Sequence, residues 1–220
     1  MSGQDINFNV DGKPARGYLA LPTQAHAPGV IVLHAWWGLN PFFKGLCDRL
    51  ASEGFVAFAP DLNEGKIAQT VDEAKQIMSE SNFERKHAVV AAAPDFLRGR
   101  PEVREEAFSL IGFSMGAAWS LMLASERPED IRKVVLFYGS EGADFSKIKA
   151  DILGHFSDAD EWEPMDGIRA MESDMRAAGL EPSFHIYPQL AHWFFENDRP
   201  EFDPQATELA WTRTLKFLRK

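Results

Sequence analysis

Short apolar runs alternate along the chain with longer segments in which apolar residues recur every three or four positions. Runs rich in Val, Ile and Phe are typical of strands, and the longer periodic segments predict amphipathic helices. This alternation is typical of βαβ units. It therefore predicts an α/β fold with a mostly parallel central sheet and helices on both faces, formed as one domain over residues 1–220.

The pattern gives approximate bounds for each element. It predicts strands at Asp5–Val10, Ala15–Leu21, Gly29–His34, Phe55–Pro60, Ala107–Phe113, Lys133–Tyr138, Asp151–Phe156 and Ser183–Tyr187. It predicts helices at Pro41–Gly54, Thr70–Ser79, Phe83–Gly99, Met115–Ser125, Met165–Ala178 and Pro204–Leu218. Turn residues between the first two strands indicate a hairpin. Roughly a dozen residues lie between the strands ending at Tyr138 and beginning at Asp151, so no large lid is expected there.

The pentapeptide Gly112-Phe113-Ser114-Met115-Gly116 stands between a predicted strand and a predicted helix. A serine on such a sharp turn projects its hydroxyl beyond the sheet, and glycines two positions before and after it let the strained backbone pass its neighbours. The helix that follows offers N–H groups and a favourable dipole for developing negative charge. Ser114 is therefore the candidate nucleophile, and the alternative is a tight turn of small residues.

A serine hydroxyl needs a base, which in this arrangement comes from a loop after the last strand. His192 follows that strand and precedes the final helix, so it is the candidate base. His34 and His155 lie at strand ends, where they either line the site or bind backbone groups. The other histidines are expected in a strand, on a helix face and in a loop: His185, His87 and His26.

The candidate acid, which orients the imidazole and stabilises its protonated form, belongs to the loop after the strand DILGHF. Asp158 and Asp160 are both suitably placed there, and spacing alone does not separate them. An oxyanion hole needs two backbone N–H groups. Met115, after the nucleophile, and Trp36, in the loop after GVIVLH, are the candidates. Aromatic residues beside these segments are candidate substrate contacts: Trp37, Trp162, Trp193 and Phe194.

Taken together, these segments resemble the dienelactone hydrolase family of α/β-hydrolases along nearly the whole chain. The resemblance lies in VIVLHAWWGLNP, FVAFAPDL, IGFSMG, ILGHFSDADEWEP and YPQLAHWFFENDRPEFDPQATELAWTRTLKFL. It implies the α/β-hydrolase fold and a triad of Ser114, Asp160 and His192, with Asp160 preferred to Asp158. It also implies an oxyanion hole from the N–H groups of Trp36 and Met115.

Three positions depart from the best-known members of that family. Ser114 replaces a cysteine nucleophile, and Ala35 replaces a glutamate that takes part in activating that cysteine. Glu196 stands where an arginine helps to hold the substrate carboxylate. Arg199 is a nearby alternative for that role, and Cys47, inside a predicted helix, is expected to be a small buried residue.

Net charge and the absence of certain sequence motifs indicate which ligands, cofactors and cellular locations to expect. A formal net charge of −10 argues against nucleic-acid binding, which needs basic surfaces. No secretory signal or membrane span is visible, so a cytoplasmic protein is expected. No metal-ligand spacing or dinucleotide-binding turn is visible, so no metal or cofactor is expected.

These features predict a hydrolase of small carboxylic esters or lactones that acts through an acyl-enzyme, as a monomer or homodimer. A thioesterase or peptidase-like hydrolase is one alternative, because it would use the same residues. A non-catalytic binding protein on a hydrolase scaffold is the other.

Overall fold

The computed structural model describes residues 3–104 and 107–220. The chain divides into two compact units, Met1–Leu110 and Ile111–Lys220, which are described in turn below. The expectation that residues 1–220 form one domain stays a prediction.

The first unit is built on four strands in the spatial order β1-β2-β4-β3. β1 (Gln4–Val10) and β2 (Lys13–Ala20) form the predicted hairpin, and β2 also pairs antiparallel with β4 (Val56–Pro60). β3 (Gly29–Leu33) pairs parallel with β4. Both strands of this parallel pair are completely buried, as expected for strands covered on both faces.

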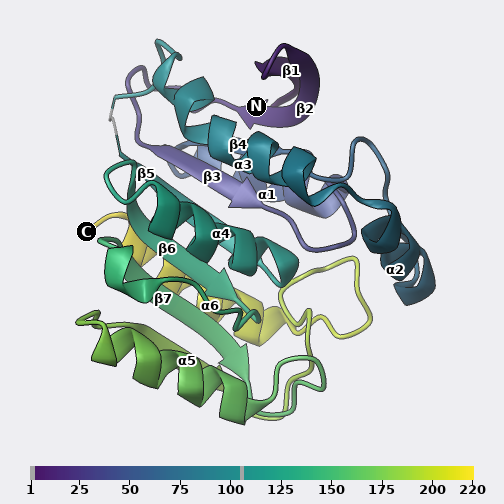
Figure 1. Ribbon diagram of the computed structural model, residues 1–220, viewed down its shortest axis with the longest axis vertical. Coiled ribbons are helices and arrows are strands. Elements are labelled where there is room, and N and C mark those ends of the chain that lie inside the picture. The colour runs from purple at the N-terminus through teal and green to yellow at the C-terminus, as the bar shows by residue number, and fades with distance from the viewer. Residues whose placement is uncertain (1–2, 105–106) are drawn as a thin grey trace. The chain divides into compact units, whose positions relative to one another are not determined.

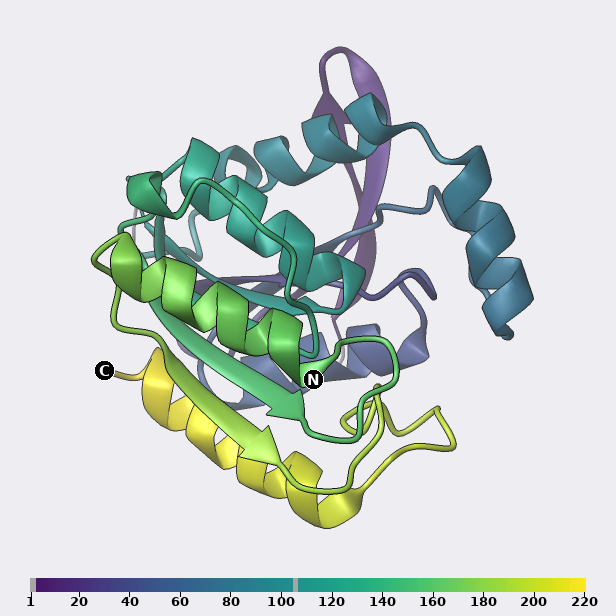
Figure 2. The same ribbon diagram turned by 60° about the horizontal axis from the view of Figure 1, so that its bottom comes forward.

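Local sequence accounts for the turns and helix ends of this unit. Asp11 and Gly12 both have positive φ, 52° and 77°, the conformation that a two-residue hairpin requires. Asn40 caps α1 (Pro41–Ser52), because its Oδ1 accepts the N–H of Phe43 at 3.2 Å. α1 and α3 (Phe83–Arg98) lie on opposite faces of the strands, and α2 (Val71–Glu80) lies beside them (Figures 1 and 2).

The second unit contains the parallel strands β6 (Ile131–Phe137), β7 (Asp151–Ser157) and β8 (Ser183–Tyr187), paired in that order. β5 (Phe108–Phe113) crosses the boundary between the units and leads into Ser114. α4 (Met115–Glu126) and α5 (Met165–Ala177) cover one face, and α6 (Pro204–Leu218) covers the other (Figures 1 and 2).

The connection from β6 to β7 is short. Its regular structure is a single turn of 3₁₀ helix, Phe145–Lys147. The expected absence of a large inserted lid at this position is therefore confirmed.

The prediction of an α/β fold with mostly parallel strands and helices on both faces is confirmed. The predicted and observed bounds of the strands and helices never differ by more than two residues at either end. Two of these differences matter, because His34 and Tyr138 lie just after β3 and β6 rather than inside them. Residues that follow the carboxyl ends of parallel strands are those that an α/β fold uses for binding and chemistry.

Candidate active site

Ser114 occupies a strained turn between β5 and α4. Its φ of 50° and ψ of −115° are unusual for a residue with a side chain, and its N–H donates to the carbonyl of Phe137 at 2.9 Å. A Cβ at Gly112 would collide with the carbonyl oxygen of Gly116 and the hydroxyl of Ser120, so only glycine fits there. The geometry is that of the predicted elbow, with the serine hydroxyl partly exposed at the start of a helix.

His192 lies against Ser114, although 78 residues separate them in sequence. Its Nε2 is 3.0 Å from Ser114 Oγ, and its Nδ1 is 2.7 Å from Asp160 Oδ2. An ionised carboxylate only accepts hydrogen bonds, so Nδ1 carries the proton and Nε2 accepts the serine hydroxyl. The imidazole is 3% exposed. This tautomer allows His192 to take a proton from Ser114.

The structure separates the two aspartates that sequence spacing left open. Asp160 is 8% exposed. Its Oδ1 accepts the N–H groups of Trp162 and Glu163 at 2.8 and 3.0 Å, which leaves Oδ2 directed at His192. Asp158 is exposed and accepts the N–H of Gln189 at 2.6 Å. Asp160 is thus the aspartate that is hydrogen-bonded to the imidazole.

The loops after β7 and β8 are tied to each other, and this holds the aspartate and the histidine in register. The bond from Asp158 to Gln189 is one tie, and the Ser157 hydroxyl donates to the carbonyl of Leu190 to make another. Gln189 adopts a positive φ of 60°, which turns the chain toward His192. Both loops leave neighbouring parallel strands at the same end.

Two further residues lie near the histidine: Tyr138, which was not foreseen, and Glu163, one of the acidic residues in the loop that supplies the aspartate. The ring of Tyr138, the first residue after β6, is 4.8 Å from the His192 ring. Glu163 is half-buried and accepts a hydrogen bond from Ser140; burial, the largest effect, raises its pKa. The position of Tyr138 at a strand end was the available signal, but nothing in its neighbours marked it as polar or functional.

Glu196, which stands where the best-known members of the resembled family have a substrate-binding arginine, is completely buried. The Tyr138 hydroxyl donates to its Oε1 at 2.8 Å. Burial raises the pKa of Glu196 to about 8. Arg199 pairs with Asp198 at 3.3 Å and acts on Glu196 in the opposite direction. A buried carboxyl at this position offers no surface for a substrate anion.

The predicted oxyanion donors lie in different units. Met115 is the first residue of α4 and directly follows Ser114. Trp36 belongs to the first unit, in a loop braced by Asn63, whose side chain donates to the Trp36 carbonyl at 2.9 Å. Convergence of the two N–H groups on one oxyanion stays a prediction.

His34 and His155 both have structural partners. The His34 Nδ1 lies 2.6 Å from the carbonyl of Ala35, and its Nε2 accepts the N–H of Leu62 at 3.0 Å. In His155, Nδ1 and Nε2 lie 2.9 and 3.0 Å from the hydroxyls of Tyr187 and Thr214. Burial lowers the pKa of both imidazoles. His34 binds backbone groups, as one of the two alternatives expects, whereas the partners of His155 are side-chain hydroxyls.

The predicted aromatic contacts differ in exposure. Trp162 is 45% exposed and its ring lies 6.5 Å from that of His192. Trp193 and Trp37 are largely buried, and Phe194 is completely buried against Tyr187. Trp162 is therefore the one of the four with substantial surface for a ligand. The burial of Phe194 gives no support to its predicted contact with substrate, and the roles of all four stay predictions.

Cys47 is completely buried in α1, and burial raises the pKa of its thiol. Its predicted place as a small buried residue inside a helix is confirmed.

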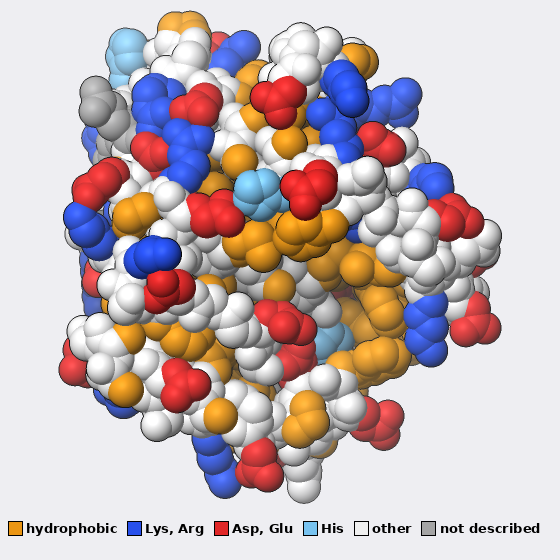
Figure 3. All heavy atoms as spheres, in the orientation of Figure 1, with side chains coloured by type: hydrophobic (Ala, Val, Ile, Leu, Met, Phe, Trp, Pro, Cys, Tyr) orange, Lys and Arg blue, Asp and Glu red, His pale blue; other side chains and the backbone are white. Residues whose placement is uncertain are grey.

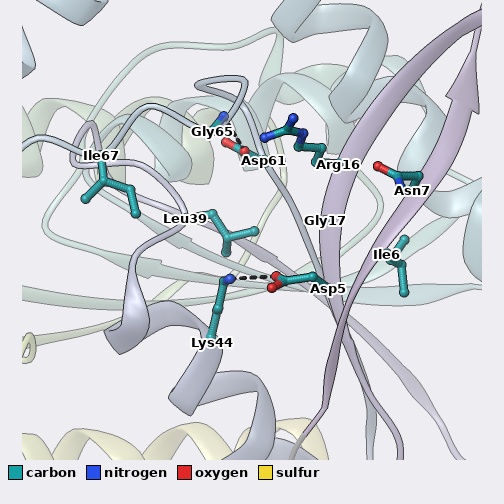
Figure 4. A pocket seen from close by; sticks show the side chains of 10 residues that line it. All are labelled: Asp5, Ile6, Asn7, Arg16, Gly17, Leu39, Lys44, Asp61, Gly65 and Ile67. Atoms are coloured by element: carbon teal, nitrogen blue, oxygen red, sulfur yellow. Dashed lines mark hydrogen bonds and ion pairs between the residues drawn. The ribbon is translucent and has the colours of Figure 1, made fainter.

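Each unit contains a cavity that Ser114 does not line. In the first, about 420 Å³ lies along β1 and β2, where Lys44 pairs with Asp5 at 2.6 Å and Arg16 lies near Asp61 (Figure 4). In the second, about 500 Å³ lies near the start of β7 and the end of α6. Neither is lined by the candidate triad.

Residues 3–104 and 107–220 hold no group of three or more His, Cys, Asp or Glu side chains that could bind a metal ion. Within the same ranges, no helix has the length and apolar character needed to cross a membrane. On the face drawn in Figure 3, Lys and Arg side chains are interspersed with Asp and Glu.

The chain is similar to known proteins along nearly its whole length. "Protein usf" of Aquifex pyrophilus is 33% identical over 228 residues, which span 99% of this chain and 98% of that protein. A putative carboxymethylenebutenolidase of Aquifex aeolicus is 29% identical over the same shares of both chains.

Among solved structures, a putative dienelactone hydrolase from Klebsiella pneumoniae superposes with a TM-score of 0.88. The match covers 100% of both chains at 21% identity, so it shows the fold. The sequence family described as "Dienelactone hydrolase family" matches residues 15–220. The chain therefore belongs to the dienelactone hydrolase family and is a carboxylic ester hydrolase.

Proposed function

We propose that the chain hydrolyses small esters or lactones through a serine acyl-enzyme. The observation that carries this proposal is the continuous hydrogen-bonded chain from Ser114 through His192 to Asp160, with separations of 3.0 and 2.7 Å. The three side chains belong to one compact unit and meet in the order that nucleophilic catalysis requires.

In this mechanism His192 takes the proton of Ser114 as Oγ attacks the carbonyl carbon. The new C–O bond gives a tetrahedral oxyanion, which collapses when the leaving oxygen takes the proton from His192. Water, deprotonated by the same imidazole, then attacks the acyl-enzyme and restores Ser114. Asp160 keeps the histidine in its productive tautomer. The N–H of Met115, at the helix start, and that of Trp36 are the expected donors to the oxyanion.

An uncharged substrate suits these residues better than an anion does. Glu196 is buried and uncharged below its raised pKa, so it neither attracts nor pairs with a substrate carboxylate. Glu163, which is half-buried and interacts electrostatically with His192, is a second acidic side chain near the base. The short connection between β6 and β7 favours small substrates. Neutral aryl esters of increasing acyl length, compared with a dienelactone, would measure this preference.

Replacement of Ser114 by alanine tests the proposal. We expect kcat/KM for a short aryl ester to fall by about 10⁴-fold or more, because the nucleophile is lost. A fluorophosphonate should label the wild-type protein and not Ser114→Ala. Ser173→Ala is the control, since this exposed serine of α5 lies in the same unit. Near-normal turnover by Ser114→Ala would refute the mechanism.

A further inference from the structure

A buried carboxyl lies behind the proposed base and is not used in the mechanism above. Glu196 follows His192 by four residues and is 0% exposed. Its Oε1 accepts the hydroxyl of Tyr138, and its Oε2 has no hydrogen-bond partner among the described residues. Its backbone is also fixed, because its N–H donates to the Trp193 carbonyl at 2.9 Å and its carbonyl accepts the Arg199 N–H at 3.0 Å.

Tyr138 connects this carboxyl to the imidazole. Its ring packs on that of His192 at a centroid distance of 4.8 Å and an interplanar angle of 57°. Its backbone has a φ of 38°, a conformation that a residue with a side chain seldom adopts. The phenol is completely buried, so its hydroxyl needs an internal partner, which Glu196 supplies. The hydrogen bond therefore fixes the far end of the ring that contacts His192.

We propose that Glu196 is a positioning residue, which holds Tyr138 against His192 and so keeps the imidazole aligned between Ser114 and Asp160. This inference rests on the proposed function, in which His192 is the base. It gives the glutamate a role other than the substrate contact considered for that position, because its side chain is enclosed by protein.

The charge state of the pair supports this role. A buried carboxylate with a single hydrogen bond is costly, so the acid form is favoured. Burial contributes most to the rise in the pKa of Glu196 to about 8; Asp198 and Glu201 add to it, while the Tyr138 bond and Arg199 oppose it.

Three charged groups thus face Glu196 from its own loop, namely Asp198, Arg199 and Glu201, and Tyr138 faces it from the position directly after β6. On the other side of Tyr138 stand His192 and Asp160, and Asp160 contributes to the raised pKa of the phenol. At neutral pH the hydrogen bond is mainly between uncharged groups.

The test compares kcat, KM and stability in variants of the pair. Glu196→Leu removes the acceptor at similar volume, and Tyr138→Phe removes the donor but keeps the ring. We expect kcat to fall about tenfold in each, with KM changed by less than about twofold, since substrate binding does not involve the pair. Glu196→Gln keeps an oxygen that accepts the phenol, so it should retain kcat near pH 7.

The double variant separates positioning from a purely structural role. Tyr138→Phe/Glu196→Leu has no unpaired polar group at the pair, so its stability should recover toward that of the wild type. If the hydrogen bond positions the ring, kcat stays about tenfold low in the double variant and the two losses do not add. Recovery of kcat together with stability would overturn the proposal, as would a kcat within twofold of wild type in Glu196→Leu.

Controls keep these outcomes distinct. Glu161→Leu changes an exposed glutamate one residue from Asp160 and should leave kcat unchanged. If Glu196→Leu does not fold, Tyr138→Phe and Glu196→Gln carry the test. Ser114→Ala is measured in parallel: activity retained there refutes the proposed function, whereas its loss together with normal kcat in Tyr138→Phe refutes the positioning role alone.

Discussion

Individual hydrogen bonds give Asp160 its place in the site. Two backbone N–H groups hold Oδ1, so Oδ2 has a fixed direction toward His192. Asp158, two residues earlier, is exposed and binds the backbone of the neighbouring loop instead. Asp158 and Asp160 are two residues apart, but Asp160 binds the imidazole and Asp158 links two loops.

Replacement of each aspartate by asparagine should separate these tasks. An asparagine at 160 presents either an N–H₂ or a neutral oxygen to Nδ1, so the productive tautomer is no longer enforced. We expect Asp160→Asn to lower kcat/KM by roughly 10³- to 10⁴-fold, and Asp158→Asn to change it by less than about threefold. Steady-state kinetics with one aryl ester measures both, and equal losses in the two variants would contradict the assignment.

The turn between β5 and α4 is the element on which the geometry of Ser114 depends. Gly112 allows the strand to pass the first turn of the helix, where the Gly116 carbonyl already accepts the Ser120 hydroxyl at 2.8 Å. Gly139, after β6, is equally confined, since a Cβ there would lie 2.7 Å from the Ser114 carbonyl oxygen. Close approach of backbone segments thus holds the serine in its strained conformation.

A single methyl group should disturb this turn. Gly112→Ala places a Cβ on the Gly116 carbonyl and the Ser120 hydroxyl, so we expect a loss of about 2 kcal/mol or more in the free energy of unfolding. Gly142→Ala is the matched control, because a Cβ there meets nothing within 4 Å. Urea denaturation of both variants measures the difference. Equal stability of the two would show that the turn can relax.

The elements could be predicted because strand and helix periodicities are local properties of the chain. The strand–glycine–serine–helix order also located Ser114, and the loop after the last strand located His192. The pairing of Tyr138 with Glu196 could not be found in this way, since the two residues are 58 positions apart. Spacing could not choose between the two aspartates, because it does not encode which backbone N–H groups face them; the family resemblance had favoured Asp160.

For the molecule as a whole, Glu196 links folding to proton binding. Its carboxyl has an ordinary pKa of 4.5 and a pKa of about 8 in the folded protein. Between these values the unfolded chain releases the proton while the folded chain keeps it. The folded state then binds more protons, so stability falls as pH rises through this window. The contribution of Glu196 is complete below pH 4.5 and is lost above about pH 8.

Glu196→Gln should remove this dependence. Its free energy of unfolding should decline less than that of the wild type between pH 5 and 8, by a margin on the order of a few kcal/mol. Urea denaturation at several pH values measures the slope, with Glu161→Gln as the exposed control. Parallel slopes for wild type and Glu196→Gln would show that Glu196 does not titrate in this range.

The burial of Cys47 has a practical consequence for spectroscopy. The chain has one cysteine, and in the folded protein its thiol, on α1, is completely buried and has a raised pKa. Maleimide dyes need an accessible thiolate, so they find no target on the native surface. A cysteine introduced at a chosen surface position would take the label alone, without removal of the natural one. The rate at which a thiol reagent modifies Cys47 would therefore measure how often the N-terminal unit opens.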